Sequence, residues 1–179
     1  MTHEEMIELI RRGIAPESML WADMGAGSGA FTRALAHLLP QAATIYAVDK
    51  DATALAALRR TTADPVYYPN GVRVVPLRGD LGGKLALPPL DGILIANALH
   101  WLPNQQRVLE NLRALLRPGG VLLAVEYDVN MPRPYIPYPL GRARFARLVR
   151  MAGYTGVDIV GERRSPSTGI VMVALLARA

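Results

Sequence analysis

The chain has 179 residues, enough for a single domain with its own hydrophobic core, and 51% of them are apolar against 20% charged, the balance of a soluble globular protein. It contains no cysteine, which excludes disulfides, thiolate zinc sites and cysteine nucleophiles, and three scattered histidines disfavour a histidine-based metal site. The net charge of +5 comes almost entirely from arginine and suits either an anionic partner or an ordinary soluble surface.

The N-terminus is predicted to form a short helix. Thr2 and Glu5 have the spacing of a capping box, apolar residues follow at helical intervals, and Gly13 ends the pattern. Residues 1–18, which comprise this helix and the segment after it, are a candidate cover for a binding site. The N-terminus is acidic where a signal peptide is basic, and no apolar run reaches the roughly 18 residues that cross a bilayer, so we expect a cytoplasmic protein without a membrane partner.

Apolar runs and helical patterns then alternate along the chain. We expect strands at residues 19–23, 44–49, 72–77, 92–96 and 121–127, and helices at residues 31–39, 52–60, 105–116 and 140–151. Two further strands, at residues 157–162 and 170–176, are separated by too short a segment for a parallel crossover and must pair antiparallel. The sequence therefore predicts one α/β domain over residues 1–179, with a mostly parallel sheet that ends in an antiparallel hairpin.

A glycine-rich turn joins the first strand to the following helix. Gly25, Gly27 and Gly29 allow a tight turn, and they let a ligand lie directly against the backbone and the start of the helix. Because Gly25 and Gly27 with Ala30 also satisfy the loose dinucleotide-binding pattern, the turn by itself is ambiguous.

Acidic residues follow two further strands. Asp49 ends the strand after the glycine turn, where a carboxylate accepts hydrogen bonds from ribose hydroxyls, and Asp80 follows the next strand, where it can accept from an exocyclic amine. Either aspartate alone is explained as a helix cap or a turn residue. Together with the glycine turn they favour a nucleoside site at the carboxyl edge of the sheet.

The ordered set of these motifs resembles the class I S-adenosylmethionine-dependent methyltransferases. The resemblance extends from about Met19 to Ala179 and rests on the segments 23–29, 47–49, 78–81, 91–97 and 116–122. It implies a Rossmann-like fold with a seven-stranded sheet whose last strand is antiparallel and with helices on both faces. It also implies S-adenosylmethionine as cofactor and S-adenosylhomocysteine as product.

The resemblance implies a role for each matching residue. The glycines would line the methionyl and ribose parts of the cofactor, and Asp23 would help to hold its amino group. Asp49 would bind the ribose hydroxyls, Asp80 and Leu81 would meet the adenine, and Asn97 would lie near the transferred methyl. The complete predicted cofactor set is Asp23, Gly25, Ala26, Gly27, Gly29, Asp49, Lys50, Asp80, Leu81 and Asn97.

Methyl transfer depends mainly on alignment in a dry site, and an acceptor hydroxyl or ammonium also needs a base. His100, just after the fourth strand, is the candidate base, although a histidine packed under the next helix explains it as well. Trp101 is interpreted as a core anchor rather than a stacking platform. The proline-rich segment 130–139 is stiff and begins at the site edge, so Arg133, Tyr135 and Tyr138 are candidates for the acceptor pocket.

We favour a small-molecule acceptor over three alternatives. An RNA methyltransferase would use the arginine stripe at residues 142–150, but the fourth strand ends Asn-Ala-Leu-His in place of the family's Asn-Pro-Pro-aromatic motif for amino groups. A nicotinamide-dependent oxidoreductase is disfavoured by the terminal hairpin and the lack of room for a second domain. A non-catalytic domain that binds the cofactor without methylating anything stays open. No metal is expected, and the sequence leaves the oligomeric state undecided.

Overall fold

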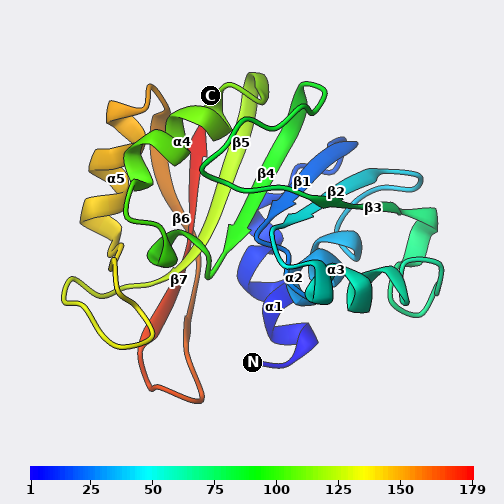
Figure 1. Cartoon of the computed structure of the whole chain (residues 1–179), viewed down its shortest axis with the longest axis horizontal. Coiled ribbons are helices and arrows are strands. Elements are labelled where there is room, and N and C mark those ends of the chain that lie inside the picture. The colour runs from blue at the N-terminus through cyan, green and yellow to red at the C-terminus, as the bar shows by residue number, and fades with distance from the viewer.

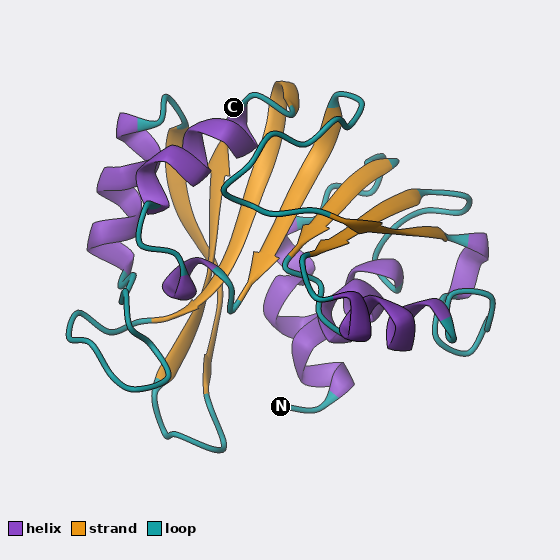
Figure 2. Cartoon of the chain, viewed as in Figure 1, coloured by secondary structure: helices purple, strands orange, loops and turns teal.

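The computed structural model describes all residues from 1 to 179 and shows a seven-stranded sheet between two layers of helices (Figures 1 and 2). The strands are β1 (Leu20–Met24), β2 (Thr44–Asp49), β3 (Arg73–Arg78), β4 (Leu90–Ala96), β5 (Leu116–Tyr127), β6 (Thr155–Arg164) and β7 (Val171–Arg178). The helices are α1 (His3–Ile10), α2 (Ala30–Ala36), α3 (Ala52–Arg59), α4 (Gln105–Arg113) and α5 (Arg142–Met151), with three short 3-10 turns, η1 (Arg11–Gly13), η2 (Pro69–Gly71) and η3 (Leu99–Trp101).

The sheet order is β3-β2-β1-β4-β5-β7-β6, and β7 is antiparallel to both of its neighbours. The predicted Rossmann-like fold with an antiparallel C-terminal hairpin is thus confirmed. β1 lies between β2 and β4. The next two strands, β2 and β3, are added on one side of β1, and the later strands are added on its other side. In such sheets ligands bind beyond the carboxyl ends of the two central strands.

Two apolar layers hold the helices on the sheet. Leu35 of α2 and Leu58 of α3 are fully buried against one face, where Leu9 and Ile10 of α1 also lie. Leu109 of α4 and Phe145 of α5 are fully buried against the other face. β4 is buried along almost its whole length, as its continuous apolar sequence predicts. None of the helices is long and apolar enough to cross a membrane.

The predicted N-terminal capping box is present: the side chain of Thr2 accepts the backbone N–H of Glu5, and the side chain of Glu5 accepts that of Thr2. α1 begins at His3, directly after the Thr2 cap, and ends at Ile10, where the turn η1 follows and ends at the predicted Gly13. It packs against α2 and β6, and it does not contribute to the central cavity described below. A role as site cover stays a prediction.

The structure differs from the expected boundaries most clearly after α4. The helix expected over residues 105–116 ends at Arg113, and β5 begins at Leu116. The pairing of β4 with β5 changes register at residues 117–120. Leu90 pairs with Leu116, whereas Gly92 pairs with Val121. An ion pair of 2.8 Å between Arg117 and the nearly buried Asp91 accompanies this irregularity.

A close backbone approach fixes α1 on the sheet. A Cβ atom at Gly161 of β6 would overlap the carbonyl oxygen of Leu9. We expect Gly161→Ala to lower the free energy of unfolding by about 2 kcal/mol, because either the helix or the strand has to move. Urea denaturation followed by circular dichroism measures this, with Gly83→Ala as control, where the added Cβ meets only an ordinary contact. Equal stability of the two variants would contradict this packing.

Candidate functional site

A cavity of about 410 Å³ opens at the centre of the carboxyl edge of the sheet. Its walls come from the loops that follow four successive strands, β1 to β4. The lining residues are Gly25, Asp49, Lys50, Gly79, Asp80, Leu81, Asn97, Ala98, Trp101 and Leu102. The structure therefore brings together most of the residues that the sequence singled out for the cofactor.

Gly25 is the residue of the glycine turn that lines this cavity, and it presents bare backbone there. The N–H groups of Gly25 and Ala26 donate to the carbonyl oxygen of Val48 at 2.8 and 3.0 Å, which joins the turn to β2. Gly25 has a φ of 80°, and a Cβ atom there would lie 2.7 Å from the Cβ of Ala98. A Cβ atom at Gly27 would meet nothing within 4 Å, so no side chain occupies that position of the turn. Ala26 itself is buried and belongs to the core.

The two aspartates that follow β2 and β3 line the same cavity. Asp49 is oriented by the backbone, since its Oδ2 accepts the Gly27 N–H at 2.8 Å and its Oδ1 accepts the Asp51 N–H at 2.9 Å. The Oδ1 of Asp80 accepts the Gly82 N–H at 2.9 Å. A carboxylate oxygen has a second lone pair, so both residues keep acceptor capacity for a ligand.

Asp23, near the end of β1, is a buried carboxyl with one oxygen that has no hydrogen-bond partner. Only 1% of the residue is exposed, and Thr32 donates to its Oδ2 at 2.7 Å, whereas its Oδ1 has no partner. Burial, with a smaller contribution from the charge of Asp49, raises the pKa of Asp23 to about 7 despite the opposing Thr32 hydrogen bond. The Oδ1 of Asn97 after β4 is likewise buried and unpartnered, and Asn97 has a left-handed backbone with a φ of 53°.

Two orphaned acceptors at one edge of the sheet fit a ligand that carries a cation or several N–H donors, because a buried acceptor without a partner costs free energy. Together with the bare backbone of the glycine turn, these acceptors fit the ammonium-bearing cofactor that the sequence resemblance implies.

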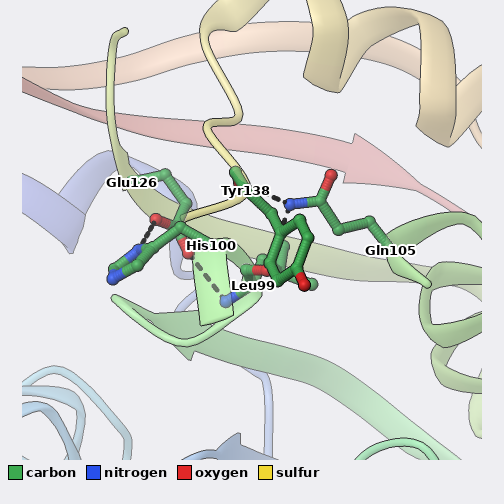
Figure 3. A network of polar contacts seen from close by, with 5 residues as sticks. All are labelled: Leu99, His100, Gln105, Glu126 and Tyr138. Atoms are coloured by element: carbon green, nitrogen blue, oxygen red, sulfur yellow. Dashed lines mark hydrogen bonds and ion pairs between the residues drawn. The ribbon is translucent and has the colours of Figure 1, made fainter. Parts of the chain in front are cut away.

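A buried polar network joins the loop after β4 to β5 (Figure 3). Glu126 accepts the Leu99 N–H through Oε1 at 2.9 Å and binds His100 Nδ1 through Oε2 at 2.5 Å. Glu126 and His100 are 1% and 3% exposed. The side chain of Gln105 donates to the carbonyl oxygens of Leu99 and Tyr138, so the loop and the proline-rich segment are held together.

The structure overturns the interpretation of Trp101 as a core anchor. Its side chain is 53% exposed and lines the cavity. The reason is the turn η3, in which Leu99 and His100 take the buried positions and the next residue faces outward. The sequence analysis also missed Glu126 as a partner of His100. The one sign of this role in the sequence is that Glu126 lies at the end of a buried strand.

The candidate acceptor residues lie outside the cavity. Arg133, Tyr135 and Tyr138 are exposed on the segment between β5 and α5, where Arg133 and Ile136 form a tight bridge. The ring of Tyr135 lies 6.5 Å from that of Tyr127, which in turn lies 5.9 Å from the ring of His100. The segment therefore reaches the site through aromatic contacts.

Comparison with known proteins agrees with this geometry. A family model described as a methyltransferase domain matches residues 22–122. A trans-aconitate 2-methyltransferase of Deinococcus radiodurans is 38% identical over 109 residues, which are 60% of this chain and 37% of that protein. One of Mycobacterium ulcerans is 29% identical over 170 residues, which are 93% of this chain and 59% of that protein. The chain thus spans between about a third and three fifths of the length of these relatives.

Solved structures show the same fold at low sequence identity. An S-adenosylmethionine-dependent methyltransferase from Aquifex aeolicus has a TM-score of 0.76 and 17% identity, covering 97% of this chain and 89% of that one. The fold and the family match define the class I S-adenosylmethionine-dependent methyltransferases. Within this class, the chain belongs to the family of the matching methyltransferase domain, and the cofactor of the class is S-adenosylmethionine.

The raised pKa of Asp23 predicts a pH-dependent stability of the ligand-free protein. The folded pKa of about 7 exceeds the unfolded value near 3.8. The contribution of Asp23 to the free energy of unfolding is therefore fully present below about pH 4 and is lost as the pH rises to about 7. Asp23→Asn removes this titration. We therefore expect the difference in free energy of unfolding between the variant and the wild type to shift in favour of the variant by about 3 kcal/mol between about pH 5 and 8. Urea denaturation at both pH values tests this. A difference that does not change with pH would contradict the buried, unpaired carboxyl.

Proposed function

We propose that the protein transfers the methyl group of S-adenosylmethionine to a small-molecule acceptor. The observation that carries this proposal is the cavity at the β1–β4 junction, where bare backbone and two oriented aspartates face the same space. Several relatives, among them trans-aconitate 2-methyltransferase and nicotinamide N-methyltransferase, are named for small acceptors, which supports this choice.

Each part of the cofactor has a candidate partner on this chain. Asp23 and Asn97 would accept hydrogen bonds from its ammonium end, and Asp49 would accept from its ribose hydroxyls. Asp80 and Leu81 would hold the adenine, with Lys50 at the rim of the cavity. The turn from Gly25 to Gly29 would lie against the methionyl chain.

The bound cofactor supplies an electrophilic methyl group on a sulfonium centre. The chain contributes alignment and exclusion of water, for which Leu81, Trp101 and Leu102 provide apolar walls in the cavity. His100 would accept the proton of a protic acceptor, and Arg133, Tyr135 and Tyr138 would form the outer wall of the acceptor site. The left-handed Asn97 would mark the boundary between cofactor and acceptor.

The nucleic-acid alternative finds less support. Arg142, the first residue of the arginine stripe, is paired with Asp128 at 2.6 Å and Glu162 at 2.9 Å. α5 also lies by the β7 and β6 end of the sheet, at the opposite end from β2 and β3, which flank the cavity (Figure 1). Phosphate contacts would give a steep decrease of tRNA affinity with salt, so weak binding without such a slope argues against this alternative.

Asp49 provides a direct test of the cofactor site. We expect Asp49→Ala to weaken S-adenosylhomocysteine binding by about tenfold or more, because the ribose hydroxyls lose a charged acceptor. Isothermal titration calorimetry measures the affinity, and circular dichroism checks the fold. Asp158→Ala, which removes an exposed aspartate paired with Arg178 on the distant hairpin, is the matched control and keeps wild-type affinity. Equal affinity of both variants would refute the site.

Catalysis is tested with methyl-labelled cofactor and a panel of small acceptors. We expect label to move to at least one acceptor, and the transfer to decrease in Asp49→Ala in proportion to its lost cofactor occupancy. Cofactor binding without transfer to any member of a broad panel would favour the non-catalytic alternative.

A further inference from the structure

An aromatic surface extends from the cofactor cavity along the carboxyl edge of β4 and β5. We define this aromatic rim as Trp101, Tyr127, Tyr135 and Tyr138. Trp101 is 53% exposed, and Tyr135 and Tyr138 are each 40% exposed. Large aromatic side chains gathered in an exposed group mark a contact surface for a ligand or partner.

Three of the rim rings, those of Trp101, Tyr127 and Tyr135, form a continuous series that passes through His100. The His100 ring lies 5.3 Å from the Trp101 ring and 5.9 Å from the Tyr127 ring, and the Tyr127 and Tyr135 rings are 6.5 Å apart. These are the separations at which aromatic rings interact. Because Trp101 also lines the cavity with Asn97, the series begins where the cofactor is proposed to bind.

His100 combines a fixed and a free ring nitrogen. Both oxygens of the buried Glu126 act as acceptors, one from the Leu99 N–H and one at His100 Nδ1. This pairing places the proton of the neutral imidazole on Nδ1 and leaves the lone pair on Nε2. Nε2 makes no hydrogen bond within the protein and lies on the side of the ring away from Gln105 and Tyr138 (Figure 3).

The charges around the rim are few. Asp128 is paired with Arg142, and Glu126 is occupied by His100, so Arg133 is the remaining charged side chain of the segment between β5 and α5. A polycarboxylate acceptor would need several cations, and this surface offers aromatic faces instead. The chemistry therefore favours a planar, uncharged acceptor whose nucleophilic group loses a proton.

We infer that the acceptor is an aromatic hydroxyl compound, stacked on the aromatic rim and deprotonated by His100 Nε2, with Glu126 as the positioning residue. This inference rests on the proposed methyl transfer. The phenol oxygen attacks the methyl carbon as its proton moves to Nε2. The carbon–sulfur bond breaks with its electron pair on sulfur, which gives an aryl methyl ether and a neutral thioether, and His100 later releases the proton to water.

The test compares two phenols of different acidity. With the weakly acidic p-cresol, we expect His100→Asn, which keeps a donor for Glu126, to lower kcat by about 100-fold or more at about pH 7. With the more acidic p-nitrophenol, which is largely ionised at about pH 8, the decrease should be less than about tenfold, because no base is needed. Glu126→Gln should lower kcat with p-cresol in the same acidity-dependent way, and Trp101→Ala should mainly raise KM.

His37→Asn, at the C-terminal end of α2 and outside the cavity lining, is the matched control and should leave both rates unchanged. An equal decrease with both phenols in His100→Asn would overturn the inference, because it would indicate a structural role for the histidine. Transfer to trans-aconitate but not to phenols would overturn it while leaving the proposed function intact. If the wild-type protein does not bind S-adenosylhomocysteine, or transfers methyl to no acceptor, both the inference and the proposed function are overturned.

Discussion

The site depends on the parallel pairing of β1 with β4 at the centre of the sheet. Trp21 of β1 pairs with Gly92 of β4, and its indole covers the space where a side chain at Gly92 would lie. This contact fixes the register of the two strands, so that their carboxyl ends stop side by side while the chain continues in opposite directions. The divergence of the following loops leaves a crevice that neither loop fills.

The ends of β1 and β4 beside that crevice carry buried acceptor atoms that have no hydrogen-bond partner within the fold. Buried acceptors in proteins are usually paired, because an unpaired group costs free energy without any compensating contact. Asp23 Oδ1 and Asn97 Oδ1 are unpaired at the ends of the two central strands. Their cost lowers the stability of the free protein, and a ligand with matching donors would recover it.

The second half of the site is held by one buried network. Glu126 at the end of β5 binds the backbone and side chain of the turn η3, and Gln105 at the start of α4 binds that turn and the proline-rich segment. Two stretches of the chain, residues 99–105 and 126–138, thereby keep fixed positions around His100. This rigidity allows an exposed aromatic surface to have a defined shape, since each ring is attached to an anchored backbone.

The sequence by itself determined the order of strands and helices, the antiparallel hairpin and most of the residues that line the central cavity. These features follow from local periodicity, from the short link between β6 and β7, and from the rule that loops after parallel strands share one edge. Tertiary structure alone decided that α4 ends at Arg113, that Trp101 faces outward and that Glu126 holds His100. Such outcomes depend on which side chain occupies a core position and which buried groups meet across the sheet. A one-dimensional pattern does not contain these contacts between distant residues.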